Sequence, residues 1–546
     1  MTNAGTISGA WTALSNVGII NTLVNSGTIL GTGLGLKLDT TSTSQPNGVG
    51  VLSNSGTISG GYTGVLNRFR TIGILTNDGT IVGGTTYGIQ NAGVITSIIN
   101  RSVINGGFAG IYNSNGSIRT INNAGTISGH YIGVVNGGDY VGSIGTITNT
   151  GVISGNNYGI ENIYGAIDTI ANSGTINGIL NQCTACGIGV LVNSGMIAGN
   201  VANFSANALT IVGGAGATLG TLTGRNGSIG TISSSNANIV FSGGNLLLND
   251  QVTVGGDTVV NNGASLTLAS PLTITGNYSQ GAGTLVLGTG ALVVSGAARL
   301  TGGTVATSLS SSGNYLAGQS TLVQGGAGSN YTGVVLQTSP ISGLVVSDPT
   351  SGTNLLLNIG NDYIGGTLAS AANTSTIAGV NTALYVANGG SLGSFSNSGV
   401  LSGNTIGIYN YAGTIGTITN ARVINGAQTG IQAIGAIGAL VNSGTISGTL
   451  GISTYRLIAT IANSGSIAGS RVGVLNFGTI GAITNGSVIS GIGGALPVSV
   501  SITPSPSGPS PTAARSSVAA RPYITGPAPP LARWSIRRPA RSPVGR

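Results

Sequence analysis

Apolar and polar residues follow one another in a unit that returns along most of the chain. Each unit holds the phrase Asn-x-Gly-Thr-Ile-x-Gly, as at residues 54–60, 123–129 and 442–448. The leading Asn stands at positions 3, 25, 54, 77, 100, 123, 149, 172 and 193, and again at 397, 420, 442, 463 and 485. Most of these positions are 21 to 23 residues apart. Such a period is typical of stacked supersecondary units rather than of one globular core with a pocket.

The apolar positions within the unit predict short β-strands. Four residues after the Asn comes an Ile in most copies, and about seven residues later comes Gly-[Ile/Val]-x-Asn, as at residues 110–113 and 407–410. The Ile residues of the first position include Ile58, Ile81, Ile104, Ile127, Ile153, Ile176, Ile424 and Ile446. These segments are rich in Ile, Val and Thr and are bounded by Asn and Gly, which favours strands over helices.

Two further apolar residues lie three positions apart just before the next Asn. The pairs are Ile144 and Ile147, Ile415 and Ile418, and Ile458 and Ile461. In a straight strand, residues three apart face opposite sides, so two apolar members predict a corner or bulge between them. Glycine tolerates the backbone that such a corner needs, and it stands there at Gly73, Gly145 and Gly416.

Three short strands and three corners in one unit predict an all-β fold, a parallel β-helix (solenoid) of roughly 23-residue coils. We expect isoleucines to line the interior and the asparagines to stack in register as an amide ladder. With a rise of about 4.8 Å per coil, the rod would be of order 100 Å long. A leucine-rich repeat has a similar period, but the Gly-rich half of each unit is hostile to its helical segment.

The repeat divides the chain into four parts. Residues 1–199 and 396–496 are regular β-helix repeats, and residues 200–395 are a less regular, β-rich segment. Residues 497–546 hold 11 of the 15 prolines and share no repeat with the body. Because proline blocks strand pairing, we expect this tail to be disordered; a shifted reading frame is one hypothesis for its origin.

Charge is scarce and unevenly placed. Charged residues are 5% of the chain, against about 25% in ordinary proteins, and Gly accounts for 99 of 546 residues. Residues 1–496 carry ten Lys or Arg and nine acids, a net charge of +1, and the Pro-rich tail supplies the other seven Arg. A basic surface for nucleic acid is therefore not expected on the folded part. No apolar run approaches the ~20 residues of a membrane helix.

Paired carboxylates would be the strongest signal for an enzyme, because glycoside hydrolysis needs two acids close together. The densest acidic group is Asp139, Glu161 and Asp168. Their offsets within the coil place Asp139 and Glu161 about 13 Å apart, too far without a bend. We therefore expect solvated surface acids and no catalytic residue.

The remaining candidate sites favour no cofactor and no metal. Cys183 and Cys186 form a lone C-x-x-C, which predicts a loop disulfide or a thiol pair within one coil, because zinc needs four ligands. Gly-Gly-Asp at residues 137–139 and 255–257 lacks the period of calcium-binding rolls. The single His130 follows a repeat corner and should be an exposed loop residue. Thr-x-Thr at residues 146–148 and 417–419 would suit an ice-binding face, but copies such as the one at Ala462 depart from it.

The runs NSGTISG, GIYN and GTIGTITN resemble the passenger region of bacterial autotransporters, the type V secreted surface proteins. Residues 273–280, followed by residues 283–288, are similar to stretches in the C-terminal part of such passengers. The resemblance covers about residues 1–496. It implies a right-handed parallel β-helix exported through the outer membrane, with roles in adhesion, aggregation or biofilm formation. Within these residues we expect neither a signal peptide nor the translocator barrel, so we expect a fragment or a truncated reading frame.

The sequence thus predicts a structural, adhesive β-helix displayed on the cell surface or secreted, and not an enzyme. Its expected partners are ligands on host or neighbouring cells, including carbohydrate, and the physical basis is an elongated form with abundant outward Asn, Thr and Ser. An unpaired first coil predicts end-to-end self-association of the chain. The alternative is a carbohydrate-active β-helix of the polysaccharide lyase or hydrolase type.

Overall fold

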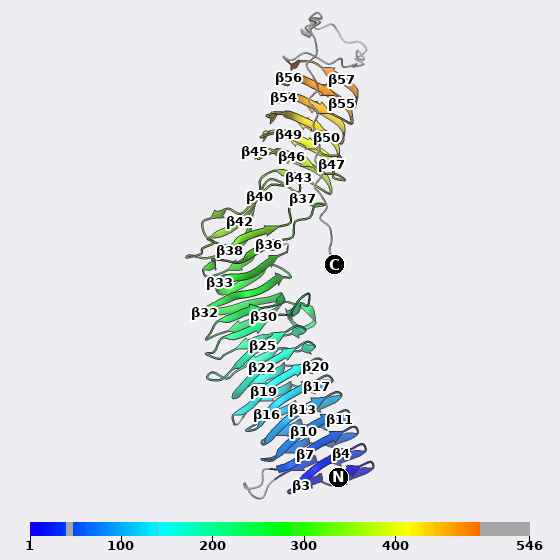
Figure 1. The fold of residues 1–546 in the computed structure, drawn as a ribbon, viewed down its shortest axis with the longest axis vertical. Coiled ribbons are helices and arrows are strands. Elements are labelled where there is room, and N and C mark those ends of the chain that lie inside the picture. The colour runs from blue at the N-terminus through cyan, green and yellow to red at the C-terminus, as the bar shows by residue number, and fades with distance from the viewer. Residues whose placement is uncertain (40–46, 139, 289, 492–546) are drawn as a thin grey trace, which may run out of the picture.

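The structure is a computed structural model that describes residues 1–39, 47–138, 140–288 and 290–491. It is a parallel β-solenoid of about 21 turns, with coils of about 23 residues, so the predicted fold class is confirmed. At a rise of about 4.8 Å per coil the column is roughly 100 Å long. Figure 1 shows the coils following one another along a single long axis from β3 (Thr12–Asn16) to β57 (Thr479–Asn485).

Each regular coil is built from three strands. One coil comprises β10 (Thr71–Asn77), β11 (Thr80–Gly83) and β12 (Tyr87–Asn91). The next coil repeats them as β13 (Val94–Asn100), β14 (Val103–Gly106) and β15 (Ala109–Asn113), each parallel to its counterpart. The described residues contain no α-helix, and one 3-10 turn lies at Arg225–Gly227. Strands thus occupy the half of the unit that a leucine-rich repeat would make helical.

The first strands of successive coils pair with one another and form one continuous face of each stack. In the N-terminal stack these strands are β4 (Ile20–Asn25), β7 (Asn47–Asn54), β10, β13, β16 (Ser117–Asn123), β19 (Gly142–Asn149), β22 (Gly165–Asn172) and β25 (Ile188–Asn193). In the C-terminal stack they are β44 (Thr367–Asn373), β47 (Ser391–Asn397), β50 (Thr414–Asn420), β53 (Ala436–Asn442), β55 (Leu457–Asn463) and β57.

Each first strand bends once, at the position where the sequence predicted a corner. In β19, Ile144 and Ile147 are both buried, although they are three residues apart. The pairing with β22 joins Ile144 to Ile167 and Thr146 to Thr169 and skips Gly145. Two successive residues, Gly145 and Thr146, therefore face outward, and both isoleucines reach the core.

The core is a column of stacked isoleucines and leucines. Those of the first strand, such as Ile98, Ile121 and Ile147, lie in register above one another and are fully buried. One continuous apolar cluster runs from Leu23 to Ile359, and a second runs from Ile364 to Ile467. Burial of a branched side chain in every coil supplies the main stabilising term of such a solenoid.

The repeated asparagines form the predicted ladder in register. Asn100 donates from Nδ2 to Oδ1 of Asn123 at 2.7 Å, and Asn123 donates to Oδ1 of Asn149 at 2.8 Å. The ladder runs from Asn3 to Asn193 in the first stack and from Asn373 to Asn485 in the second.

The expectation that these asparagines add to an outward polar surface was wrong. Asn123 is 2% exposed, and Asn100 and Asn149 are 0% exposed. The amide turns inward because backbone carbonyls converge at this corner. In Asn123 the Nδ2 atom also donates to the carbonyl oxygens of Gly125, at 3.1 Å, and of Val152, at 3.0 Å.

A second ladder closes the corner after the third strand. It comprises Asn67, Asn91, Asn113, Asn136, Asn162, Asn181 and Asn203, each linked to the next by an Nδ2 to Oδ1 hydrogen bond of 2.7–2.9 Å. All of them except Asn203 are the Asn of the Gly-[Ile/Val]-x-Asn phrase. Two amide columns therefore fix the register of the first stack.

The middle of the chain departs from this scheme. Beyond β31 (Ile239–Gly243) the coils use long curved strands, β32 (Asn245–Leu268) and β33 (Leu272–Leu287). The antiparallel pair β38 (Gly318–Gln324) and β42 (Asn354–Ile359) follows, and three-stranded coils with the Asn ladder resume at β44. The Pro-rich tail at 497–546, expected to be disordered, lies outside the described residues. Among the described residues, no helix is long and apolar enough to cross a membrane.

Candidate functional site

An open groove crosses the outer side of the first strands in four successive coils. It has a volume of about 410 Å³ and lies over β13, β16, β19 and β22. Its lining residues are Val94, Ile95, Thr96, Ser117, Ile118, Arg119, Ser143, Ile144, Gly145 and Asp168. The groove exists because each of these strands bends, so that the residues on either side of the buried isoleucine point outward.

Arg119 and Asp168 are the only charged residues in the groove lining. Both are exposed, and both stand at the bend, one residue after the first buried Ile. The register places Gly145 between them, because Ile118 pairs with Ile144 and Ile144 with Ile167. Two coil rises separate their backbones by about 9.6 Å. No ion pair joins the two side chains in the part of the chain that the structure describes.

The three acids singled out from the sequence lie in different surroundings. Asp139 lies outside the described residues. Asp168 is exposed in the groove, as expected. Glu161 lies on β21 (Tyr158–Asn162) and is 9% exposed, so its interpretation as a solvated surface acid was wrong. Its Oε1 accepts a hydrogen bond of 3.0 Å from Nε2 of Gln182, and burial raises the pKa of its carboxyl group.

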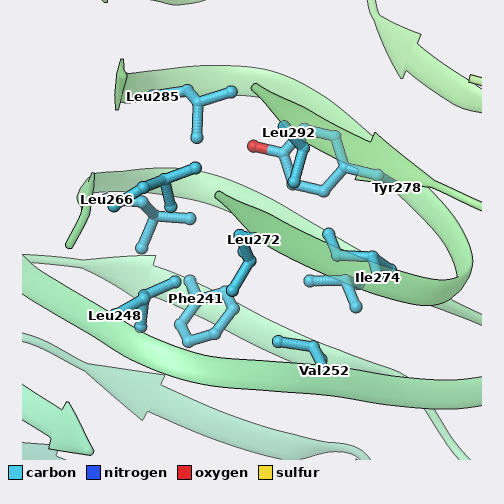
Figure 2. A pocket seen from close by; sticks show the side chains of 11 residues that line it. Phe241, Leu248, Val252, Leu266, Leu272, Ile274, Tyr278, Leu285 and Leu292 are labelled. Atoms are coloured by element: carbon cyan, nitrogen blue, oxygen red, sulfur yellow. The ribbon is translucent and has the colours of Figure 1, made fainter. Parts of the chain in front are cut away.

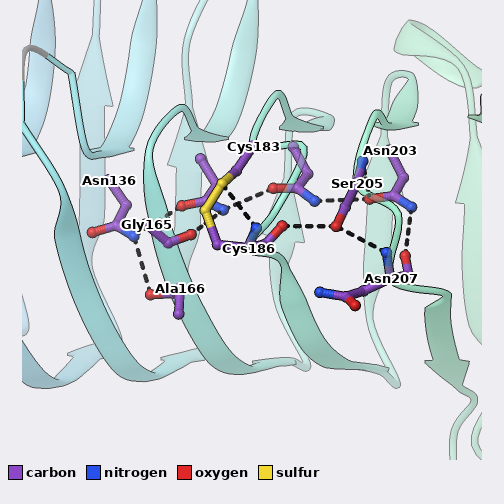
Figure 3. Close-up of a disulfide and its surroundings, with 10 residues drawn as sticks. Asn136, Gly165, Ala166, Cys183, Cys186, Asn203, Ser205 and Asn207 are labelled. Carbon is purple, nitrogen blue, oxygen red and sulfur yellow. Dashed lines mark hydrogen bonds between the residues drawn. A yellow bond between two sulfur atoms is a disulfide. The ribbon is translucent and has the colours of Figure 1, made fainter. Parts of the chain in front are cut away.

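Cys183 and Cys186 form a disulfide in the corner after β24 (Ile179–Asn181). Figure 3 shows the bond beside the second Asn ladder, where Asn203 closes the next corner. The hydroxyl of Ser205 donates to the carbonyl oxygen of Cys186 at 2.7 Å, and so ties the disulfide loop to the following coil. Of the two interpretations of this C-x-x-C, the loop disulfide is therefore the one that the structure has.

The disulfide should stabilise this corner without supporting the whole column. Because only three positions separate the two cysteines, the loop it closes in the unfolded chain is short, and chain entropy gives about 2 kcal/mol. We expect Cys183→Ser/Cys186→Ser to raise amide hydrogen exchange in residues 182–187 and the adjoining corner only, since solenoid coils interact mainly with their neighbours. Wild-type chain in a reductant is the matched control, because the reductant opens the same disulfide without a substitution. Loss of protection across many coils would contradict this expectation.

The other candidates show no convergent chemistry. His130 is exposed, as expected, and its ring lies edge-on to that of Tyr131, with centroids 4.6 Å apart. Asp257 lies half-buried in β32, and the Gly-Gly-Asp of residues 137–139 falls partly outside the described residues. Among the described residues, no group of three or more His, Cys, Asp or Glu side chains could hold a metal ion.

The core around β32 and β33 is closely packed. An apolar gap beside β32 and β33 has a volume of about 10 Å³, space for a single water at most. Figure 2 shows Phe241, Tyr278 and aliphatic side chains of β32 and β33 closing around it. The hydroxyl of Tyr278 donates to Oε1 of Gln280 at 2.8 Å, so this buried polar group is satisfied within the core. This part of the core therefore has no room for a ligand larger than water.

Sequence reasoning missed two surface features. One is Arg119, which only the alignment of coils reveals as a charged residue at a position that is usually glycine. The other is a row of exposed aromatic side chains at the start of the third strand: Trp11, Tyr62, Phe108 and Tyr131. The ring centroids of Trp11 and Tyr62 are 5.4 Å apart, and those of Phe108 and Tyr131 are 5.6 Å apart. No protein-family model, curated protein or solved structure matches this chain.

Proposed function

We propose that this chain is a structural, adhesive β-helix that is displayed on a cell surface or secreted. The observation that carries the proposal is the elongated solenoid of about 21 turns, which exposes a long side surface. Strand faces of this kind present Thr, Ser and Gly at regular intervals, and a groove crosses the first strands of four successive coils. Such a surface suits contact with an extended or repetitive partner.

The candidate acids support adhesion over catalysis. A glycosidase needs two carboxyl groups that face each other across the scissile bond. In this chain Glu161 is buried against Gln182, whereas Asp168 is exposed in the groove beside Gly145, and no hydrogen bond joins the two among the described residues. The resemblance of residues 1–496 to autotransporter passengers supplies the cellular context of the proposal.

Adhesion is testable with the purified chain immobilised on inert beads. We expect the beads to attach to bacterial lawns or epithelial monolayers and soluble chain to compete with them in a saturable way, because both present the same surface. Beads coated with heat-unfolded chain are the control. Attachment no greater than that of the control would refute the adhesive function. Release of reducing or unsaturated sugar ends from polysaccharide incubated with the chain would instead support the enzyme alternative.

A further inference from the structure

The outward residue at the bend of the first strand is usually glycine. Counterparts of Gly145 in other coils are Gly50, Gly73, Gly189, Gly393, Gly416, Gly438 and Gly481. In the three other coils that line the groove, the same position holds Thr96, Arg119 and Asp168. The groove is thus the place in the regular stacks where charged side chains enter this column of small residues.

Side chains at this position disturb the packing between coils. A Cβ built on Gly145 would lie 2.6 Å from the carbonyl oxygen of Arg119, closer than van der Waals contact allows. A Cβ on Gly73 or on Gly416 would meet the carbonyl oxygen of the preceding coil in the same way. The copies at Arg119 and Asp168 carry a side chain where the glycine copies have no room for one, as do those at Asn21, Ala369 and Ala459. Of these side chains only those of Arg119 and Asp168 are charged, and they stand two coils apart in one groove, a departure from the local pattern that favours a functional position.

Arg119 and Asp168 lie two coils apart, so a ligand that contacts both must lie along the axis of the solenoid. Arg119 presents a guanidinium fork that matches a carboxylate, and Asp168 accepts hydrogen bonds from hydroxyl or amide groups. Their backbones lie about 9.6 Å apart, roughly the length of a disaccharide. Gly145 has no side chain to fill the space between them, so a ligand can approach the backbone there. Ser117 and Ser143 add exposed hydroxyl groups along one side.

A peptide fits this groove less well than a sugar chain. Extended peptides bind sheets by adding a strand at an open edge. The groove lies instead on the face of β13, β16, β19 and β22, whose backbones already pair with one another. The charged and hydroxyl groups of the lining suit the hydroxyl and carboxylate groups of a polysaccharide.

We propose that this groove binds a linear acidic polysaccharide, with the carboxylate of one sugar at Arg119 and the hydroxyl or amide groups of the next, neutral sugar at Asp168. The glycosidic linkage between these two sugars lies over Gly145. This inference rests on the proposed adhesive function and names the class of its ligand. The Asp168 carboxylate disfavours a polymer in which every sugar is acidic, because like charges repel.

The test measures binding of the whole chain to three immobilised polymers by biolayer interferometry. They are hyaluronan, in which acidic and neutral sugars alternate; polygalacturonate, in which every sugar is acidic; and neutral dextran. We expect wild type to bind hyaluronan most tightly and dextran least tightly, with affinity falling as salt rises. Arg119→Gly should weaken hyaluronan binding about tenfold, because a charge-assisted bidentate contact is lost. Asp168→Gly should strengthen binding to polygalacturonate.

Both variants restore the residue that this position usually has, so they should fold. Arg422→Gly is the matched control: it removes one exposed positive charge at a corner where other copies also have glycine, such as Gly27 and Gly56, and it lies outside the groove. It should leave hyaluronan binding unchanged. Circular dichroism checks that every variant keeps its β-structure.

The proposal is overturned if Arg119→Gly binds the three polymers as wild type does, or if wild type binds none of them. Polyglutamate is measured as a fourth polymer. If wild type binds it as tightly as hyaluronan, and Arg119→Gly weakens that binding, the groove is assigned to an acidic peptide instead. The bead assay separates this failure from that of the proposed function. If Arg119→Gly/Asp168→Gly beads attach as well as wild-type beads, the groove is not the adhesive site but adhesion stands; if wild-type beads do not attach, adhesion itself fails.

Discussion

Replacing Asn123 with alanine should lower the free energy of unfolding of its coils by about 3–5 kcal/mol. The side chain is 2% exposed and makes four hydrogen bonds at the corner after β16. Its Nδ2 atom donates to Asn149 Oδ1 and to the carbonyl oxygens of Gly125 and Val152, and its Oδ1 accepts from Nδ2 of Asn100. Alanine leaves Asn149 Oδ1 buried without this hydrogen bond. It also removes one partner each from Asn100 Nδ2 and from the carbonyl oxygens of Gly125 and Val152, and lost hydrogen bonds of buried polar groups are costly. Urea unfolding followed by circular dichroism measures the loss.

The neighbouring Asn122 provides the control for this prediction. It has the same side chain but points outward and is exposed. Asn122→Ala should change stability by no more than about 0.5 kcal/mol. Because coils of a solenoid can open separately, hydrogen exchange should place the damage in the coils of β13, β16 and β19. Equal stability of the two variants would mean that water replaces the amide and that the ladder contributes little.

The fold could be predicted from the sequence because one period governs most of the chain. A strand-length apolar segment in every unit, with Asn at a fixed place, leaves few arrangements other than stacked coils in register. The two isoleucines three residues apart even located the bend at Gly145. No such alignment extends from β29 (Gly220–Thr223) to β43 (Asp362–Ile364), where neither Asn ladder continues, and there the curved strands β32 and β33 could not be anticipated.

The burial of the asparagines and of Glu161 could not be read from residue type. A polar side chain is expected outside unless the fold supplies partners inside, and those partners are backbone carbonyls that converge only when coils stack. For Glu161 one signal was present. Its register neighbours on β18 (Ile132–Asn136) and β24, Val135 and Leu180, are apolar, which indicates a covered position.

The groove, too, could not be predicted from residue type, because it depends on the register of the coils. Arg119 and Asp168 are 49 positions apart, and neither belongs to a recognisable motif. They come together because the coils between them place both residues in one column, with Gly145 between them. Once the Asn positions are aligned, the column can be written down from the sequence. The depth of the groove cannot, because it depends on how far each strand bends.

Asp250→Asn should stabilise the chain at neutral and alkaline pH by about 2–4 kcal/mol. Asp250 lies on β32, opposite Gly230, and is fully buried. No hydrogen bond of ordinary geometry reaches either carboxylate oxygen. Burial therefore raises the pKa of this carboxyl group to about 7, although the backbone N–H of Gly230 lowers it in part. Asparagine has nearly the same shape and carries no charge that must be desolvated.

The sign of the effect follows from proton binding. With a folded pKa of about 7 and an unfolded value of 3.8, the folded chain holds more protons between these two pH values. The free energy of unfolding therefore falls as pH rises through this window and stays lowered above it. Asp250→Asn should match wild type at pH 4 and exceed it at pH 8 in thermal and urea unfolding. The exposed Asp348→Asn should change stability by less than about 0.5 kcal/mol at either pH. A constant difference between Asp250→Asn and wild type from pH 4 to pH 8 would show that the buried group does not take up a proton on folding.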